Sequence, residues 1–163
     1  MQPVTEKALR SAFINASRSE AAKATLPDDF ADVAWEDLDY FGWRDARMPQ
    51  RGYILRWQEN RLVGLMLRAP DGGSGKNRRV LCDLCRDVFS KDDVYLWVAR
   101  RAGQSGRDGN TVGTLVCADF GCSRRVRVLP KPSEIQPDPH VVVAAQIDGL
   151  ARRTDLFLAK VGA

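Results

Sequence analysis

An alternation of apolar and polar positions in the first half of the chain predicts a β-hairpin. In residues 52–58, Tyr53, Leu55 and Trp57 fall on one side of an extended chain, and Ile54 and Arg56 fall on the other. Residues 62–68 form a second strand-like segment, and the three residues between the two segments, Glu59-Asn60-Arg61, are typical of a tight turn. The pattern therefore predicts two antiparallel strands joined by this turn.

Helical patterns flank the strand-forming part of the chain. Residues 6–26 are mostly good helix formers with a thin apolar stripe, Thr5 can cap their first turn, and Pro27 ends the run. Near the other end, Asp138 and Pro139 suit the start of a last helix. Its apolar positions near helical spacing are Val143, Ile147, Leu150, Phe157 and Val161.

Two alternatives stay open for this last helix. Gly149 costs about 1 kcal/mol relative to alanine inside a helix, so a break there is one possibility. The apolar positions favour a helix that packs back on the core, and the alternative is an exposed helix that binds a partner.

A second ribbon is predicted further along the chain. Residues 79–81 read as a short strand, residues 94–101 alternate well enough for another, and residues 112–116 return as a third. Between the last two strands, residues 103–110 form a loop with three glycines. A helix is expected to start at about residue 118 and to carry Arg124, Arg125 and Arg127.

The four cysteines lie in two close pairs that flank this ribbon. Cys82 and Cys85 are separated by two residues, and Cys117 and Cys122 by four. Thiolates at such spacing can reach one ion when the backbone folds into a tight knuckle, and a four-sulfur tetrahedral site suits zinc and leaves no open position for catalysis. The alternatives are two disulfides or four unrelated buried thiols, but nothing in the sequence suggests export to an oxidising compartment.

The expected fold class is α+β. It combines an N-terminal helix and β-hairpin, an antiparallel sheet with a four-cysteine zinc finger, and a C-terminal helix. A knuckle, a hairpin and a helix that bears the second cysteine pair are the parts of a treble clef. We expect residues 1–70 to form the N-terminal helix and hairpin region, residues 71–131 the zinc-binding domain, and residues 132–163 a connector and a helix that packs on the core.

Charge and composition narrow the possible functions. The net charge is +4, and the basic excess falls in residues 71–131, which carry twelve Lys/Arg against seven Asp/Glu. This excess favours an acidic partner, either nucleic acid or an acidic protein surface.

No apolar run approaches the roughly 20 residues of a membrane span, and no secretion signal is visible, so we expect a cytoplasmic protein. No nucleophile-and-base set can be assembled, which argues against an enzyme and a small-molecule substrate.

Three motifs resemble a known family. They are Arg100-Arg101-Ala102-Gly103, the segment from Gly109 through Asn110-Thr111-Val112-Gly113-Thr114-Leu115-Val116 to Cys117-Ala118-Asp119, and Trp35-Glu36-Asp37-Leu38-Asp39-Tyr40-Phe41-Gly42-Trp43-Arg44-Asp45. With the cysteine pairs, they are similar to the elongation-factor-G-binding protein family, which includes the fusidic-acid resistance proteins of the FusB type. The resemblance covers roughly residues 5–127, and it implies a treble-clef zinc domain that binds elongation factor G and helps it to leave the ribosome.

The resistance proteins have a larger helical N-terminal domain than the roughly 80 residues that precede Cys82 here, so the resemblance leaves drug resistance itself open. The expected contact with the factor is the ribbon, its loop and the start of the following helix. Its candidate residues are Arg100, Arg101, Arg107, Asn110 and Phe120. Arginine and aromatic side chains are common binding hot spots, but Phe120 could instead pack the second knuckle. The alternative function is binding of ribosomal RNA, because basic residues lie near Trp97.

Overall fold

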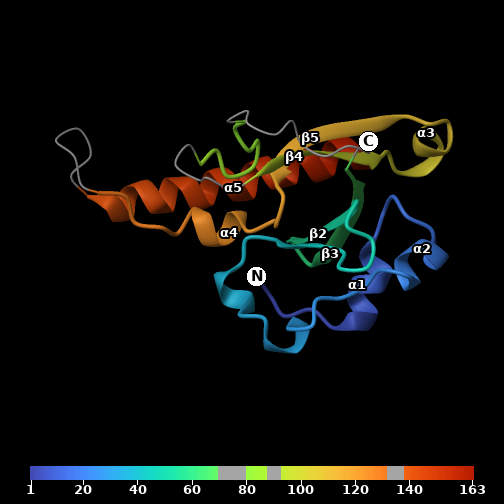
Figure 1. Cartoon of the computed structure of the whole chain (residues 1–163), viewed down its shortest axis with the longest axis horizontal. Coiled ribbons are helices and arrows are strands. Elements are labelled where there is room, and N and C mark those ends of the chain that lie inside the picture. The colour runs from blue at the N-terminus through green and yellow to red at the C-terminus, as the bar shows by residue number, and fades with distance from the viewer. Residues whose placement is uncertain (70–79, 88–92, 132–137) are drawn as a thin grey trace.

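The computed structural model describes residues 1–69, 80–87, 93–131 and 138–163, and its centre is an antiparallel five-stranded sheet (Figure 1). The strands follow one another in the sheet in the order β1-β2-β3-β4-β5. They are β1 (Phe41–Arg44), β2 (Arg51–Gln58), β3 (Arg61–Arg68), β4 (Val94–Arg100) and β5 (Thr111–Cys117). The expected α+β class, with an antiparallel sheet and a C-terminal helix, is confirmed.

The predicted hairpin is confirmed as β2 and β3. Gln58 pairs with Arg61, and Glu59 adopts a φ of 53° in the turn between them. The sequence did not predict β1, which pairs with β2 through Phe41 and Leu55. β1 is only four residues long, and a strand of that length carries too few alternating positions to stand out.

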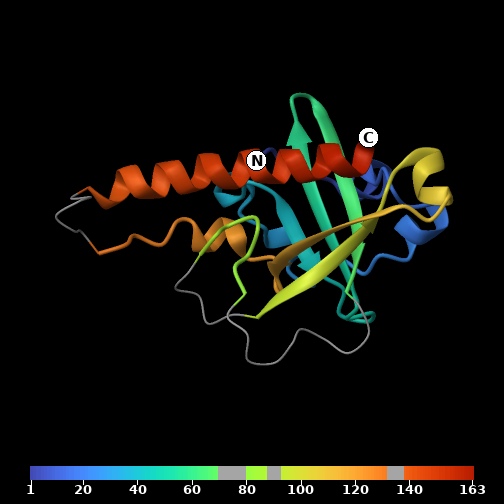
Figure 2. The ribbon, with the colours of Figure 1, turned by 90° about the horizontal axis from the view of Figure 1, so that it is seen from above.

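The second ribbon joins the hairpin at a narrow point. β4 pairs with β5 over seven residue pairs, whereas its register with β3 is the single pair Arg68–Val98. The ribbon therefore diverges from β2 and β3 (Figure 2). Its predicted loop contains a short helix, α3 (Gly103–Arg107), where a Cβ on Gly106 would lie 1.7 Å from the Arg101 carbonyl oxygen. Glycine is required there because the two backbone segments nearly touch.

The predicted single helix over residues 6–26 is wrong, because the structure has two shorter helices there. They are α1 (Glu6–Ala12) and α2 (Arg18–Ala22). Ser17 starts α2 with a capping box, and Phe13 leaves the helical path to bridge Gly64 of β3. Tertiary contact with the sheet and local capping thus override the helix propensity of the segment. Two short 3-10 helices, Phe30–Asp32 and Trp35–Asp37, follow before β1.

The sheet carries an apolar core on each face. Tyr53 and Leu55 of β2 pack with the N-terminal segment and its aromatic side chains, whereas Ile54 belongs to the core on the opposite face. This opposite core holds the four cysteines and the buried residues of the C-terminal helix. The strand alternation in the sequence therefore predicted the two faces correctly, because successive strand residues point to opposite sides.

The C-terminal helix α5 (Pro139–Gly162) is continuous, so the break that was left open at Gly149 does not occur. Asp138 caps it by accepting a hydrogen bond from the backbone N–H of His140. Its second half packs on the sheet, and Asp155 there pairs with Arg56 of β2 at 2.7 Å. Its first half projects beyond the sheet (Figures 1 and 2). No helix in the described part of the chain has the length and apolarity needed to cross a membrane.

Contacts connect the three regions that the sequence suggested as domains. Asn15 donates a hydrogen bond to the Arg100 carbonyl oxygen, and Asp39 pairs with Arg127, which joins the first two regions, and Arg56 pairs with Asp155 of α5, which joins the first to the third. The boundaries at residues 70 and 132 lie outside the described residues, so the division into 1–70, 71–131 and 132–163 stays a prediction.

Candidate metal centre

The first cysteine pair lies on a tight turn that is fixed to β5. The backbone N–H of Cys85 points at the Cys82 Sγ at 3.5 Å, and Arg86 follows with a φ of 53°. Asp83 fastens the turn, because its carboxylate accepts hydrogen bonds from the Thr114 hydroxyl and the Leu115 backbone N–H. The strand expected over residues 79–81 is absent at residues 80 and 81, and residue 79 lies outside the described residues.

The second cysteine pair spans the end of β5 and the start of α4 (Cys122–Arg125). The helix begins at Cys122 rather than near residue 118, because Phe120 adopts a left-handed φ of 57°, which interrupts a right-handed helix. Asp119 stabilises the turn by accepting a hydrogen bond from the Gly121 backbone N–H and by pairing with Arg125 at 2.9 Å. The left-handed backbone conformation of Phe120 thus turns the chain so that the thiols of Cys117 and Cys122 face the first pair.

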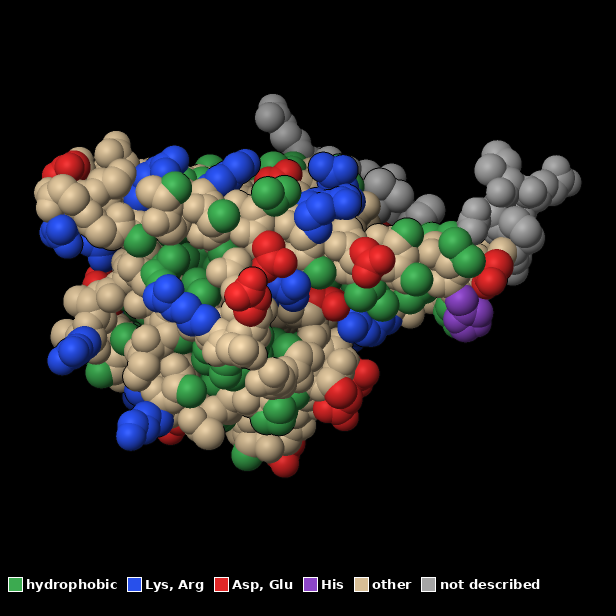
Figure 3. All heavy atoms as spheres, turned by 180° about the vertical axis from the view of Figure 1, so that it is seen from behind, with side chains coloured by type: hydrophobic (Ala, Val, Ile, Leu, Met, Phe, Trp, Pro, Cys, Tyr) green, Lys and Arg blue, Asp and Glu red, His purple; other side chains and the backbone are tan. Residues whose placement is uncertain are grey.

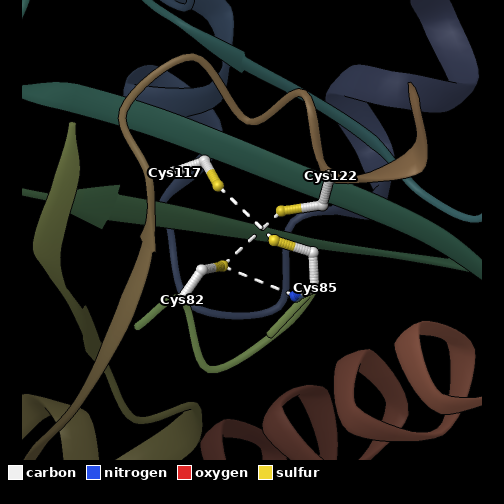
Figure 4. Close-up of side chains that lie close together, drawn as sticks. All are labelled: Cys82, Cys85, Cys117 and Cys122. Atoms are coloured by element: carbon white, nitrogen blue, oxygen red, sulfur yellow. Dashed lines mark hydrogen bonds between the residues drawn. The ribbon is translucent and has the colours of Figure 1, made fainter. Parts of the chain in front are cut away.

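The four thiols converge on one point (Figure 4). The Sγ atoms of Cys82 and Cys122 are 3.7 Å apart, those of Cys85 and Cys117 are 3.6 Å apart, and all four lie within 4.8 Å of one another. A zinc–sulfur bond of about 2.3 Å gives a tetrahedron with edges of about 3.8 Å. The four buried cysteines are free rather than disulfide-bonded, so this geometry fits one zinc ion.

Burial of four thiols without a cation creates an electrostatic conflict. Contact with Cys117 lowers the pKa of the Cys82 thiol and raises the pKa of the Cys122 thiol, so in the absence of a cation the group does not ionise as a whole. A divalent cation stabilises all four thiolates together. Within the described residues, no other group of three or more His, Cys, Asp or Glu side chains is arranged to hold a metal.

Elements outside the ribbon support both knuckles. Arg153 of α5 donates from Nε to the Leu84 carbonyl oxygen at 2.6 Å, and the Tyr40 hydroxyl donates to the Phe120 carbonyl oxygen at 3.0 Å. Burial, followed by the nearby Cys122 thiol, raises the pKa of Tyr40 well above its ordinary value, so this hydroxyl stays a donor. Sequence reasoning missed these supports because each bridges residues far apart in the chain.

The metal centre and the fold point to a family. The family model for the FBP C-terminal treble-clef zinc-finger matches residues 8–161. The chain belongs to this family. The resemblance drawn from the sequence is thereby confirmed, and the match and the cysteine cluster together identify a treble-clef zinc finger with zinc as its cofactor.

A solved structure extends the comparison. This FBP-type zinc-finger chain resembles the structure of the fusidic acid resistance protein FusC with a TM-score of 0.53 and 17% sequence identity. The similarity covers 76% of this chain and 52% of the FusC chain, so the chain spans about half the length of FusC. At this identity the likeness concerns the fold. No curated protein matches the chain.

The expected partner residues differ in their surroundings. Arg107 and Asn110 are exposed at the tip of the ribbon, where the Arg107 side chain donates to Gln104 and the Asn110 side chain donates to Ser105. Arg100 pairs with Glu20 at 2.7 Å, and Arg101 donates to the Ala163 carbonyl oxygen at 3.2 Å.

Phe120 is buried, with 3% of its surface exposed, and it packs on Trp97 at a centroid distance of 4.8 Å. This burial favours the alternative in which Phe120 packs the second knuckle over its role as a contact residue. Trp97 itself is fully buried, so it offers no surface on which a base of RNA could stack.

Proposed function

We propose that this chain is a zinc-containing binding protein whose partner is translation elongation factor G, and that it helps the factor to leave the ribosome. The observation that carries the proposal is the family match over residues 8–161 together with the four-cysteine centre. The likeness in fold to FusC supports it, because FusC is a fusidic acid resistance protein. The role is binding rather than catalysis, and its place is the cytoplasm, where elongation factor G works.

In this proposal, zinc has a structural role at the base of the binding surface. Cys82, Cys85, Cys117 and Cys122 are the four ligands, and a centre with four thiolates has no open position for substrate. Because Cys117 ends β5, the ion fixes the orientation of the ribbon that carries α3. A rigid base lowers the conformational entropy that the ribbon would lose on binding.

The tip of the ribbon is the proposed contact. Arg107 and Asn110 are exposed there, and no ion pair within the described residues occupies Arg107. Arg100 is 53% exposed despite its pair with Glu20, so it extends the positive surface along β4. An acidic surface on the factor would complement these charges and steer its approach.

Binding to elongation factor G and to ribosomal RNA can be compared directly as the salt concentration rises. Zinc content is measured first, and the zinc-loaded chain then flows over immobilised factor or immobilised RNA. We expect saturable binding to the factor that persists from about 50 to 200 mM salt, whereas RNA binding would weaken steeply through counterion release. Binding to RNA alone would support the nucleic-acid function, and absence of binding to the factor at tens of micromolar would refute the proposal.

A further inference from the structure

The outward side of α5 carries a row of exposed side chains. The helix buries Leu150, Thr154, Phe157 and Val161 against the body of the protein. The exposed positions on the opposite side are Val141, Ala144, Ala145, Asp148, Arg152, Leu156, Ala159 and Gly162. At about 100° per residue, these eight positions lie within about 60° of one line along the helix, and Asp155, which pairs with Arg56 of β2, lies in the same sector. Two of them are large apolar side chains, with Val141 55% exposed and Leu156 56% exposed.

Six of these positions form three pairs about the middle of the helix; helix geometry gives this spacing to any stripe opposite position 150, so the residue types in the pairs carry the argument. Asp148 and Arg152 lie two residues on either side of position 150, Ala144 and Leu156 lie six residues on either side, and Val141 and Ala159 lie nine. Position 150 is also the midpoint of Pro139–Gly162 to within one residue. A two-fold axis through this point brings each position opposite its counterpart on a second, antiparallel helix.

We propose that α5 pairs antiparallel with α5 of a second copy of this chain, so that Asp148 of each copy faces Arg152 of the other. In this arrangement Leu156 packs against Ala144, and Val141 packs against Ala159, each large side chain against a small one. Such pairs allow two helices to approach closely along their length. The proposal concerns association of the chain with itself and does not depend on elongation factor G.

The charges at the centre of the pattern are complementary and available. Neither Asp148 nor Arg152 has an ion-pair partner among the residues that the structure describes. An incoming Asp148 from a second copy would meet Arg152 in the antiparallel register, whereas a parallel pairing would bring like charges together.

The shape of the molecule agrees with such pairing. The first half of α5 extends beyond the sheet, and the whole helix crosses the upper part of the view in Figure 3 with its projecting end at the right. A helix of 24 residues is about 36 Å long. In an antiparallel pair, the C-terminal half of the second helix would lie along the projecting half of the first, where Val141 is exposed.

A single chain offers one alternative use for the two charges. Asp148 and Arg152 are four residues apart with the acid first, which is the favourable order for an ion pair within one helix. That pair would stabilise the helix slightly and would require no second copy. The two interpretations differ in how variants with one reversed charge behave alone and in mixtures.

Sedimentation equilibrium of the zinc-loaded full chain distinguishes them. We expect the parent to show a reversible monomer–dimer equilibrium between about 10 and 500 µM, and Asp148→Arg or Arg152→Asp alone to raise the dissociation constant at least about tenfold. An equimolar mixture of the two variants should dimerise again, because each copy then supplies the charge that the other needs. The double variant D148R/R152D should recover the homodimer, and Arg61→Asp on the β2–β3 turn should leave the parent equilibrium unchanged.

The equimolar mixture of the two variants separates loss of pairing from a folding defect, because a misfolded variant would not dimerise in the mixture. All these side chains are exposed, and helix content and zinc content are checked in each variant. A parent that stays monomeric up to about 500 µM would overturn the proposal, since weaker association would have no use at cellular concentrations. A parent that dimerises while the mixture does no better than either variant would also overturn it, because the dimer would then use another surface or register.

Discussion

The ion pair between Asp39 and Arg127 connects the segment before β1 to the segment after α4, and its removal tests whether the two halves of the chain stabilise each other. The Asp39 carboxylate lies 2.6 Å from Arg127 Nη1, and the Asp39 side chain is 8% exposed. The Asp39 backbone N–H also donates to the Ser123 hydroxyl at 3.0 Å. Arg127 donates in addition to the Ser123 carbonyl oxygen at 2.9 Å, directly after the ligand Cys122.

The expected cost follows from this partial burial. Breaking a buried ion pair by removing one partner costs about 3–5 kcal/mol, whereas exposed pairs are worth at most about 1 kcal/mol. The Arg127 side chain is 28% exposed, so water solvates it partly once its partner is gone. We therefore expect Asp39→Ala to lower the free energy of unfolding by about 2–3 kcal/mol, with a coupling energy between the two residues of about 1–2 kcal/mol.

A double-mutant cycle measures this coupling. Urea unfolding of the zinc-loaded parent, Asp39→Ala, Arg127→Ala and the double variant is followed by tryptophan fluorescence and by zinc release. The pair Glu6–Arg10 in α1, whose Glu6 side chain is 56% exposed, serves as control, with an expected coupling of about 0.3–0.5 kcal/mol. A coupling below about 0.5 kcal/mol for Asp39 and Arg127 would refute the reasoning, because distant independent sites add within that range.

Three further predictions follow from the site and its supports. Cys117→Ser should release zinc and unfold the finger, because structural zinc contributes about 10 kcal/mol or more of apparent binding free energy, and zinc in the purified variant equal to that of the parent would contradict this. Phe157→Ala should destabilise by about 3–5 kcal/mol in thermal or urea unfolding, since Phe157 is 5% exposed, and an unchanged transition would mean that α5 does not pack on the core. Burial alone would raise the pKa of Asp45, but hydrogen bonds from the Thr25 backbone and the Tyr53 hydroxyl outweigh it and lower the pKa. This carboxylate therefore stabilises the fold above its ordinary pKa of about 3.9, and the contribution is lost as the pH falls through the lower folded-state value. Asp45→Asn should cost about 1–3 kcal/mol at pH 7, with the difference from the parent shrinking below about pH 4, and a difference constant with pH would refute the assignment.

The features that local sequence encodes could be predicted. The β2–β3 hairpin follows from alternation and a short turn, and the metal centre follows from two close cysteine pairs. The hairpin turn and each cysteine pair are recognised from residues that lie close together in the chain. The start of α5 at Asp138 and Pro139 was readable for the same reason, since capping is a local interaction.

The features that depend on contacts between distant parts of the chain could not be predicted from the sequence. The sequence made Phe120 a candidate contact residue, but in the structure its side chain fills the space that two strand glycines leave open. A Cβ on Gly52 would lie 2.4 Å from the Phe120 ring, and one on Gly42 would lie 2.9 Å from its Cβ. Glycines within strands indicate a close approach, yet the sequence does not say which side chain approaches. The end of α1 at Ala12 likewise depends on the bridge between Phe13 and Gly64, 51 positions further along the chain.

The most direct test of the account is the affinity of elongation factor G for the zinc-loaded parent, for Arg107→Glu at the ribbon tip and for Arg61→Glu at the β2–β3 turn. Both arginines are exposed, and the second provides the same charge change away from the proposed contact. Calorimetric titration should show saturable binding by the parent, at least about tenfold weaker binding by Arg107→Glu, and parent-like binding by Arg61→Glu. Equal affinities for all three would place the contact elsewhere on the chain. No binding by the zinc-loaded parent at tens of micromolar would contradict the central claim that this zinc-finger protein binds the factor.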